Sequence, residues 1–413
     1  MKRLIFIASL AMLAVGCQKT EIQNEVLTPI GFSTEVGKQT RAIVQDGTYD
    51  TEQPFAVYAY GHQGNAAATT VMDNVEVSYQ TDTWKATSGS YYWPNDPSTT
   101  LNFYAYSPAL VDTPTAQNDH QKLNGTITHF ETAPDDGSAT AGFSLTAYQH
   151  TNMYVDFMVA TPVLNATFGH PDGSDTQSQY AGTAGTVPLT FNHEMTQILF
   201  KVTTDKVYPG VTFTVEEVTL KNIKDQGTYT HASLTPSYTN DPQTSAFTHG
   251  VWSGQTVMAG EGTFTIFPAD TDNGAVVPNG RVMSDTDNTV EKEIELTYAA
   301  NATDASALAE MTTTGVTMIP QILVASTPAD QNTGASAVNG QSFTIVYRIE
   351  GTGVASETVT KTVDLYTDDV STVHWEANKK ITYTVKIGLN EILFEPSVAE
   401  WTTETGNEYT FQQ

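Results

Sequence analysis

The stretch Lys380–Leu389, KITYTVKIGL, decides the fold class. Its apolar residues Ile381, Tyr383 and Val385 alternate with threonines, and Gly388 ends the run. Successive side chains of a strand point to opposite faces, so an apolar residue at every second position is typical of a strand with one buried face. This segment therefore predicts a β-strand.

Short segments of the same kind recur along the chain, each bounded by Gly, Pro, Asn or Asp. They are PFAVYAY (54–60), NVEVSYQTDTW (74–84), TLNFYAYSP (100–108), YVDFMVATP (154–162), QILFKVTTD (197–205), VTFTVEEVTL (211–220), GTFTIFPA (262–269) and SFTIVYRIE (342–350). NATDASALAEM (301–311) is the best candidate for a short helix. Repeated strands with turn signals between them predict an all-β protein built from sandwiches.

Two domains are expected from the length of the chain. About 390 residues remain after the N-terminal signal described below, and a chain of that size can bury two cores. The stretch 165–186 is rich in Gly, Ser and Asp and poor in apolar residues, which is typical of a linker. With the boundary near Gly185, the sequence predicts an N-terminal β-sandwich over 42–185 and a C-terminal one over 186–400.

The chain begins with MKRLIFIASLAMLAVGC, which has the organisation of an export signal. Its apolar run is shorter than the roughly 18 residues that a membrane-spanning helix needs. Cys17 is the only cysteine of the chain and directly follows the small residues that end the run. This position resembles the lipobox of bacterial lipoproteins, although Ala14 stands where a larger aliphatic residue is usual. We predict a signal peptide over 1–16, lipid attachment at Cys17 and no disulfide.

The charge balance excludes nucleic acid as a partner. Lys and Arg together number 18 against 46 for Asp and Glu, and the net charge is -28. Phosphate binding needs clustered basic residues, which this chain lacks. The nine histidines show no metal-ligand spacing, and His193 is predicted to be a core or turn residue. We predict no catalytic residue, metal or cofactor, and assembled carboxylates are the remaining alternative for an enzyme.

Five segments in sequence order resemble the fimbrillin family, the lipoprotein-derived pilus subunits of gut and oral anaerobes. They are WKATSGSYYWPNDPSTTLNFYAYSP (84–108), YVDFMVATP (154–162), VPLTFNHEMTQILFKV (187–202), TMIPQ (317–321) and VHWEANKKITYTVKIGLNEILFEPSVAEW (373–401). The resemblance implies two transthyretin-like β-sandwich domains after a lipoprotein signal peptide. It also implies an outer-membrane lipoprotein precursor and then an extracellular pilus with a role in adhesion. The implied partners are the outer membrane through the lipid, a trypsin-like surface protease, other copies of the chain and related pilus subunits.

The family's first strand is cut off after a basic residue, which leaves a groove for a strand of the next subunit. In this chain Ile30, Phe32 and Val36 share one parity, so a strand over 29–36 places them on one buried face. These three residues are the predicted removable strand.

Arg41, one of only four arginines, follows this strand and is the predicted cleavage site, with Ala42 as the new N-terminus. Residues 17–41 then form a lipidated pro-segment that is lost. Lys38 is the rival cleavage site, and a solvated loop residue is the alternative interpretation of Arg41.

The C-terminal segment 401–413 is the predicted donor strand. Trp401, Tyr409 and Phe411 fall on one parity, so an extended tail presents three aromatic side chains to one side. Adding such a strand to a vacated groove is β-augmentation. An ordinary last strand of the chain's own domain is the alternative. A subunit with both groove and donor is predicted to be a stalk subunit, and a tip or anchor fimbrillin is the alternative.

A surface glycan-binding lipoprotein is the alternative from another class of protein. SYYWP (90–94), Trp252 and Trp375 offer aromatic rings that can stack on sugars. Aromatic residues also fill the cores of sandwiches, so exposure of these rings discriminates between the two functions.

Overall fold

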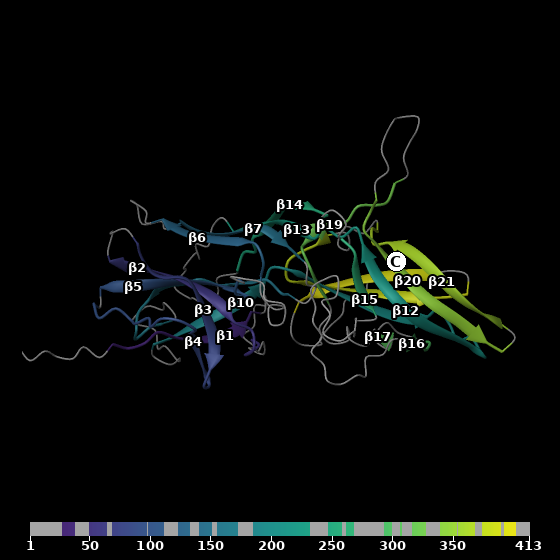
Figure 1. Cartoon of the computed structure of the whole chain (residues 1–413), viewed down its shortest axis with the longest axis horizontal. Helices are drawn as coiled ribbons and strands as arrows, with labels where there is room; N and C mark the ends of the chain where they lie inside the picture. The colour runs from purple at the N-terminus through teal and green to yellow at the C-terminus, as the bar shows by residue number, and fades with distance from the viewer. Residues whose placement is uncertain are drawn as a thin grey trace, which may run out of the picture.

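The computed structural model of the chain shows an all-β protein whose two halves follow one another along its long axis (Figure 1). It describes residues 27–37, 49–63, 68–96, 98–110, 123–132, 140–150, 155–171, 185–231, 247–257, 262–267, 293–299, 306–307, 316–327, 339–352, 354–367, 374–389 and 392–401. Within these ranges no helix is long and apolar enough to cross a membrane.

The first sheet closes on itself in the N-terminal half. Its order is β2 (Phe55–Gln63), β3 (Thr69–Gln80), β4 (Thr83–Ala86), β1 (Gly31–Val36), β10 (Thr186–His193), β8 (Met158–Ala160), β5 (Thr99–Ser107) and β9 (Val163–Ala166). An additional pairing of β2 with β5 completes the closure. A core that includes Phe55, Val57 and Phe103 fills its interior.

A second sheet covers the outer face of β2 and β5. It contains β14 (Val251–Thr256), β13 (Gln226–His231), β7 (Thr140–Gln149) and β6 (Thr126–Thr132). The residues of β2 alternate between two cores, because Phe55 and Val57 face the interior whereas Tyr58 and Tyr60 face the second sheet. Burial on both faces explains why this segment reads as an apolar run.

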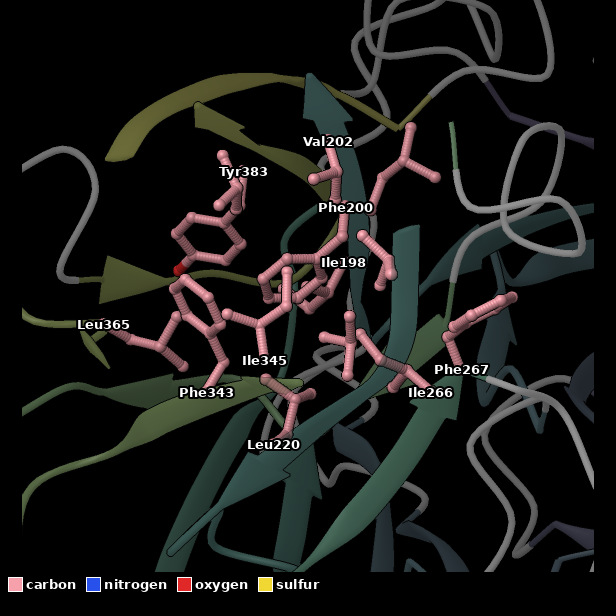
Figure 2. Packing of buried hydrophobic residues seen from close by; sticks show 14 of the residues in the cluster. Ile198, Phe200, Val202, Leu220, Ile266, Phe267, Phe343, Ile345, Leu365 and Tyr383 are labelled. Carbon is pink, nitrogen blue, oxygen red and sulfur yellow. The ribbon is translucent and has the colours of Figure 1, made fainter. Parts of the chain in front are cut away.

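The C-terminal half is a β-sandwich. One sheet holds β17 (Ser306–Ala307), β11 (Thr196–Thr204), β23 (Lys379–Ile387) and β24 (Ile392–Glu400), with β18 (Val316–Met318) also paired to β11. The other holds β15 (Phe264–Phe267), β12 (Val211–Lys221), β20 (Ser342–Gly351) and β21 (Val354–Asp364), with β16 (Ile294–Glu295) on β12. Between them Phe200, Phe343 and Tyr383 point into one core (Figure 2). A pair, β19 (Gln321–Ile322) and β22 (His374–Trp375), completes the strands.

The sequence predicted the strands well and their connections less well. All nine quoted segments carry strands, and the all-β class is confirmed. The segment 74–84 is two strands, because Thr81 and Asp82 adopt positive φ and form a two-residue hairpin turn. The short helix expected over 301–311 is wrong at its two described residues, which form β17 against the edge of β11.

The sheets connect the two halves predicted from the sequence. β10, which begins just after Gly185, pairs with β1 and β8 of the first sheet. β13 and β14 join β7 in the second sheet, although they follow β11 and β12 in the chain. The division at residue 185 stays a prediction, as does the transthyretin-like character of the domains.

Candidate functional site: the slot of the first strand

Strand β1 lies inside the first sheet and not at its edge. It runs parallel to β10 over six residue pairs, from Gly31 opposite Thr186 to Val36 opposite Phe191. On its other side Phe32 pairs with Trp84 of β4. Backbone bonds extend the ladder at both ends, where Gly31 N donates to Gly185 O at 3.0 Å and Gly37 N donates to Phe191 O at 2.7 Å. Removal of β1 therefore vacates a slot between β10 and β4.

The side chains of β1 are distributed as the alternation predicted. Ile30 and Phe32 are buried, and the partly buried Val36 packs against the same core. The outward-facing Glu35 accepts a hydrogen bond at 2.6 Å from Thr190 Oγ1. The buried face expected for 30, 32 and 36 is thus confirmed at Ile30 and Phe32, whereas Val36 is only partly buried.

Aromatic rings line the floor of the slot. The ring of Phe32, which is 5 % exposed, lies edge-on to Phe55 at 6.0 Å and to Phe103 at 6.1 Å between centroids. Trp84 and Phe191 extend this floor on the two flanking strands. A chain without β1 loses the cover over these rings, and another apolar strand would restore it.

The predicted processing residues Cys17, Lys38, Arg41 and Ala42 lie outside the described residues. Their positions in the sequence nevertheless show which strand a cut would release. A cut after Lys38 or Arg41 falls between β1 and Tyr49, the next described residue in the first core. One cut there breaks the covalent connection between β1 and every other strand that the structure describes.

Trp401, the first residue of the predicted donor strand, is buried in its own chain. Its indole stacks on the imidazole of His193 with centroids 3.9 Å apart and planes 7° from parallel. His193 Nδ1 lies 2.6 Å from Asp156 Oδ2, and Trp401 N donates to Asn378 O at 2.9 Å. In this conformation Trp401 packs in the core of its own chain beneath the second sheet. Tyr409 and Phe411 lie outside the described residues.

His193 is the site residue whose role the sequence predicted least completely. The sequence predicted a core or turn histidine, and the ring is buried at the end of β10. Its contacts with Asp156 and Trp401 are separated by 37 and 208 residues, so no local pattern signals them.

The sequence of the chain matches the model of one protein family. A sequence model described as fimbrillin-like matches residues 40–401. The chain belongs to the fimbrillin-like family. No curated protein matches it.

Solved structures similar to this fimbrillin-like chain come from Bacteroides and Porphyromonas species. A fimbrial protein from Bacteroides vulgatus is 18 % identical with a TM-score of 0.49, covering 91 % of this chain and 99 % of that one. A putative cell adhesion protein from Bacteroides ovatus is 13 % identical with a TM-score of 0.43, covering 92 % and 99 %. The tip fimbrial protein Mfa3 from Porphyromonas gingivalis is 10 % identical with a TM-score of 0.26, covering 85 % and 95 %.

The aromatic residues proposed as sugar platforms are mostly core residues in this fimbrillin-like chain. Trp93, Trp252 and Trp375 are buried. Their indole N–H groups donate to Gly185 O, Glu194 O and Tyr383 Oη, respectively. A ring must be exposed to stack on a sugar. These three tryptophans are therefore not available for glycan binding in this conformation.

Three other histidines, the buried His150 and His231 and the partly buried His129, lie where desolvation favours the neutral ring. Burial lowers the pKa of His129 to about 3 and the pKa values of His150 and His231 to about 4. His150 shows the reason: Nε2 lies 2.6 Å from Thr317 O and Nδ1 lies 2.9 Å from Tyr148 Oη. A neutral ring satisfies both contacts by donating to the carbonyl and accepting from the phenol. Among the described residues no group of three or more His, Cys, Asp or Glu is arranged to hold a metal.

We expect acid to destabilise the fold through these histidines. Each has a folded-state pKa below the 6.5 of an ordinary histidine, so the unfolded chain binds more protons between about pH 6.5 and 4. The contribution of these histidines to the free energy of unfolding is thus highest above pH 6.5 and falls as the pH drops, by roughly 3 kcal/mol for His150 alone at pH 4. The raised pKa of the buried Glu194 works in the opposite direction. Urea denaturation at pH 7 and pH 4.5 measures the change.

The matched variant for this prediction is His129→Phe, which keeps a ring among Tyr58, Tyr104 and Phe143 but cannot titrate. Its stability should depend less on pH than that of the unaltered chain. Equal stability of the unaltered chain at the two pH values would contradict the prediction.

Proposed function

We propose that this chain is a structural pilus subunit of the stalk, polymerised by strand exchange after removal of β1 and with a role in adhesion. The observation that carries the proposal is the placement of β1, which lies between β10 and β4 and covers an aromatic floor. A segment containing Lys38 and Arg41 follows it directly. A trypsin-like surface protease is the partner that recognises such residues.

The energetics favour a joint that rarely dissociates. Burying Ile30 and Phe32 contributes roughly 1.5 to 3 kcal/mol for each side chain, and the partly buried Val36 contributes less. Ladder hydrogen bonds over the six paired residues add about 0.5 to 1.5 kcal/mol each. A donated strand recovers these terms at the positions that it fills, less the cost of ordering it. Polymerisation therefore needs no covalent link between subunits.

Export and anchoring precede assembly in this proposal. The signal peptide directs export, Cys17 takes up lipid, and the precursor stays anchored at the outer membrane until the cut releases it into the pilus. Its partners there are other copies and related pilus subunits.

We expect fatty-acid labelling to depend on Cys17. It is the only cysteine and follows the apolar run of the signal, so no other thiol can accept the lipid. Cells that express the unaltered chain should incorporate labelled palmitate into it, and cells that express Cys17→Ala should not. Equal labelling of both chains would contradict lipid attachment at this residue.

The function is tested by the N-terminus of the protein at the native cell surface. Mass spectrometry of sheared surface polymers should find Ala42 as the first residue, or Gln39 if Lys38 is cut. A lipidated Cys17 on all surface copies would instead favour the anchored glycan-binding lipoprotein, which has no use for losing its first strand.

A further inference from the structure

The root of the C-terminal tail is held at one end of the β1 slot. β24 pairs with β23 as far as Glu400, opposite Lys379, and the next residue, Trp401, stacks on His193. His193 is the last residue of β10, two positions beyond Phe191, which is the partner of Val36. The tail therefore starts at the end where β1 leaves the slot.

The direction of β1 makes this position unfavourable for self-insertion. Because β1 is parallel to β10, a strand with its direction must enter beside Gly185 and run toward His193. Gly185, which directly precedes β10, and His193, its last residue, are eight positions apart, or about 26 Å along a strand. Tyr409 is eight residues beyond Trp401, so its maximum reach is also about 26 to 29 Å. With Tyr409 at the Ile30 site, the tail would be fully extended on arrival, with no residue left to reverse its direction.

Entry in the opposite direction places the wrong side chains in the slot. In the register set by Trp401 beside His193, Thr403 would take the place of Val36 and Asn407 that of Phe32. The Phe32 site is lined by phenylalanine rings. A buried amide without a hydrogen-bond partner costs about 1 to 3 kcal/mol.

The tail of a second copy has neither constraint. It can enter beside Gly185 and run parallel to β10, with Tyr409 at the Ile30 site and Phe411 at the Phe32 site. Both pairs are two residues apart, so both rings face the same core.

We propose that anchoring Trp401 on His193 prevents a cut subunit from closing its own slot and directs its tail into the slot of a second copy. This inference rests on the proposed strand exchange and adds the register and the exclusion of self-insertion. Its physical basis is the reach of the tail from a fixed root.

The test lengthens the tail without altering its aromatic residues. Eight residues of alternating Gly and Ser are inserted between Trp401 and Thr402, and the control carries the same insert between Asp330 and Gln331. Both proteins are cut at Arg41, separated from β1 and compared with the unaltered chain by melting and by polymer yield. The lengthened tail can reach the entry beside Gly185, and its effective concentration of millimolar order exceeds micromolar protein.

We expect the cut tail-insert variant to stay monomeric and to melt as the uncut chain does, with polymer yield lower on the order of 100-fold at micromolar protein. The control should polymerise as the unaltered chain does. Polymerisation of the tail-insert variant at the control's level would overturn the inference. The inference would also be overturned if the cut tail-insert variant had the low melting temperature of a cut chain whose slot is open. It would likewise be overturned if the cut unaltered chain were monomeric and had the melting temperature of the uncut chain, because its slot would then be closed. Failure of the proposed function would give a different result. The cut Tyr409→Ser, Phe411→Ser protein would then polymerise as well as the cut unaltered chain.

Discussion

Replacing Lys38 and Arg41 together by alanine is expected to abolish polymerisation and leave a stable monomer. In the uncut chain β1 is tethered beside its own slot, with an effective concentration of millimolar order. A donor strand from another copy at micromolar concentration competes at a disadvantage of about a thousandfold. The variant keeps β1 between β10 and β4 after protease treatment, so no slot opens. Light scattering after addition of trypsin-like protease measures polymer growth.

The matched control removes the same charges elsewhere. Arg281→Ala combined with Lys361→Ala also loses one arginine and one lysine, but both basic residues near β1 remain. This control should polymerise at the rate of the unaltered chain. Growth of the Lys38→Ala, Arg41→Ala protein at that rate would show that removal of β1 is not required.

The local features of the slot could be predicted from sequence because they depend on neighbouring residues. Alternation over 30–36 predicted the buried face that Ile30 and Phe32 form. The same logic located the strand that became β23. Neither needs knowledge of any residue far along the chain.

The surroundings of β1 could not be predicted, because its partners are distant in sequence. Thr186, the partner of Gly31, is 155 residues away, and nothing in either segment specifies a parallel pair. The run PFAVYAY likewise does not reveal that its alternate residues face two different cores. The stacking of Trp401 on His193 has no local signal in the sequence either. The alternation of residues in the tail therefore led to the prediction that Trp401 belongs to the donor strand with Tyr409 and Phe411.

Replacing Tyr409 and Phe411 together by serine is expected to stop polymer growth without lowering the melting temperature of the monomer. If the tail is donated, these rings contribute to the core of the next subunit and not to their own. Cut protein should then keep an open slot and remain unpolymerised. Melting of the uncut variant and polymer length after the cut are measured on the same preparation.

Trp401→Ala is the contrasting variant, because this ring is only 8 % exposed and stacks on His193 in its own chain. Truncation of a buried tryptophan to alanine typically costs about 3 to 5 kcal/mol, so its melting temperature should fall by several degrees. A similar fall for the Tyr409→Ser, Phe411→Ser protein would make the tail an ordinary strand of its own domain. Unchanged polymer length would refute donation by these two residues. Only loss of polymer growth with an unchanged melting temperature assigns the two rings to the neighbouring subunit. A chain that has both the slot and the donor strand would then be a stalk subunit.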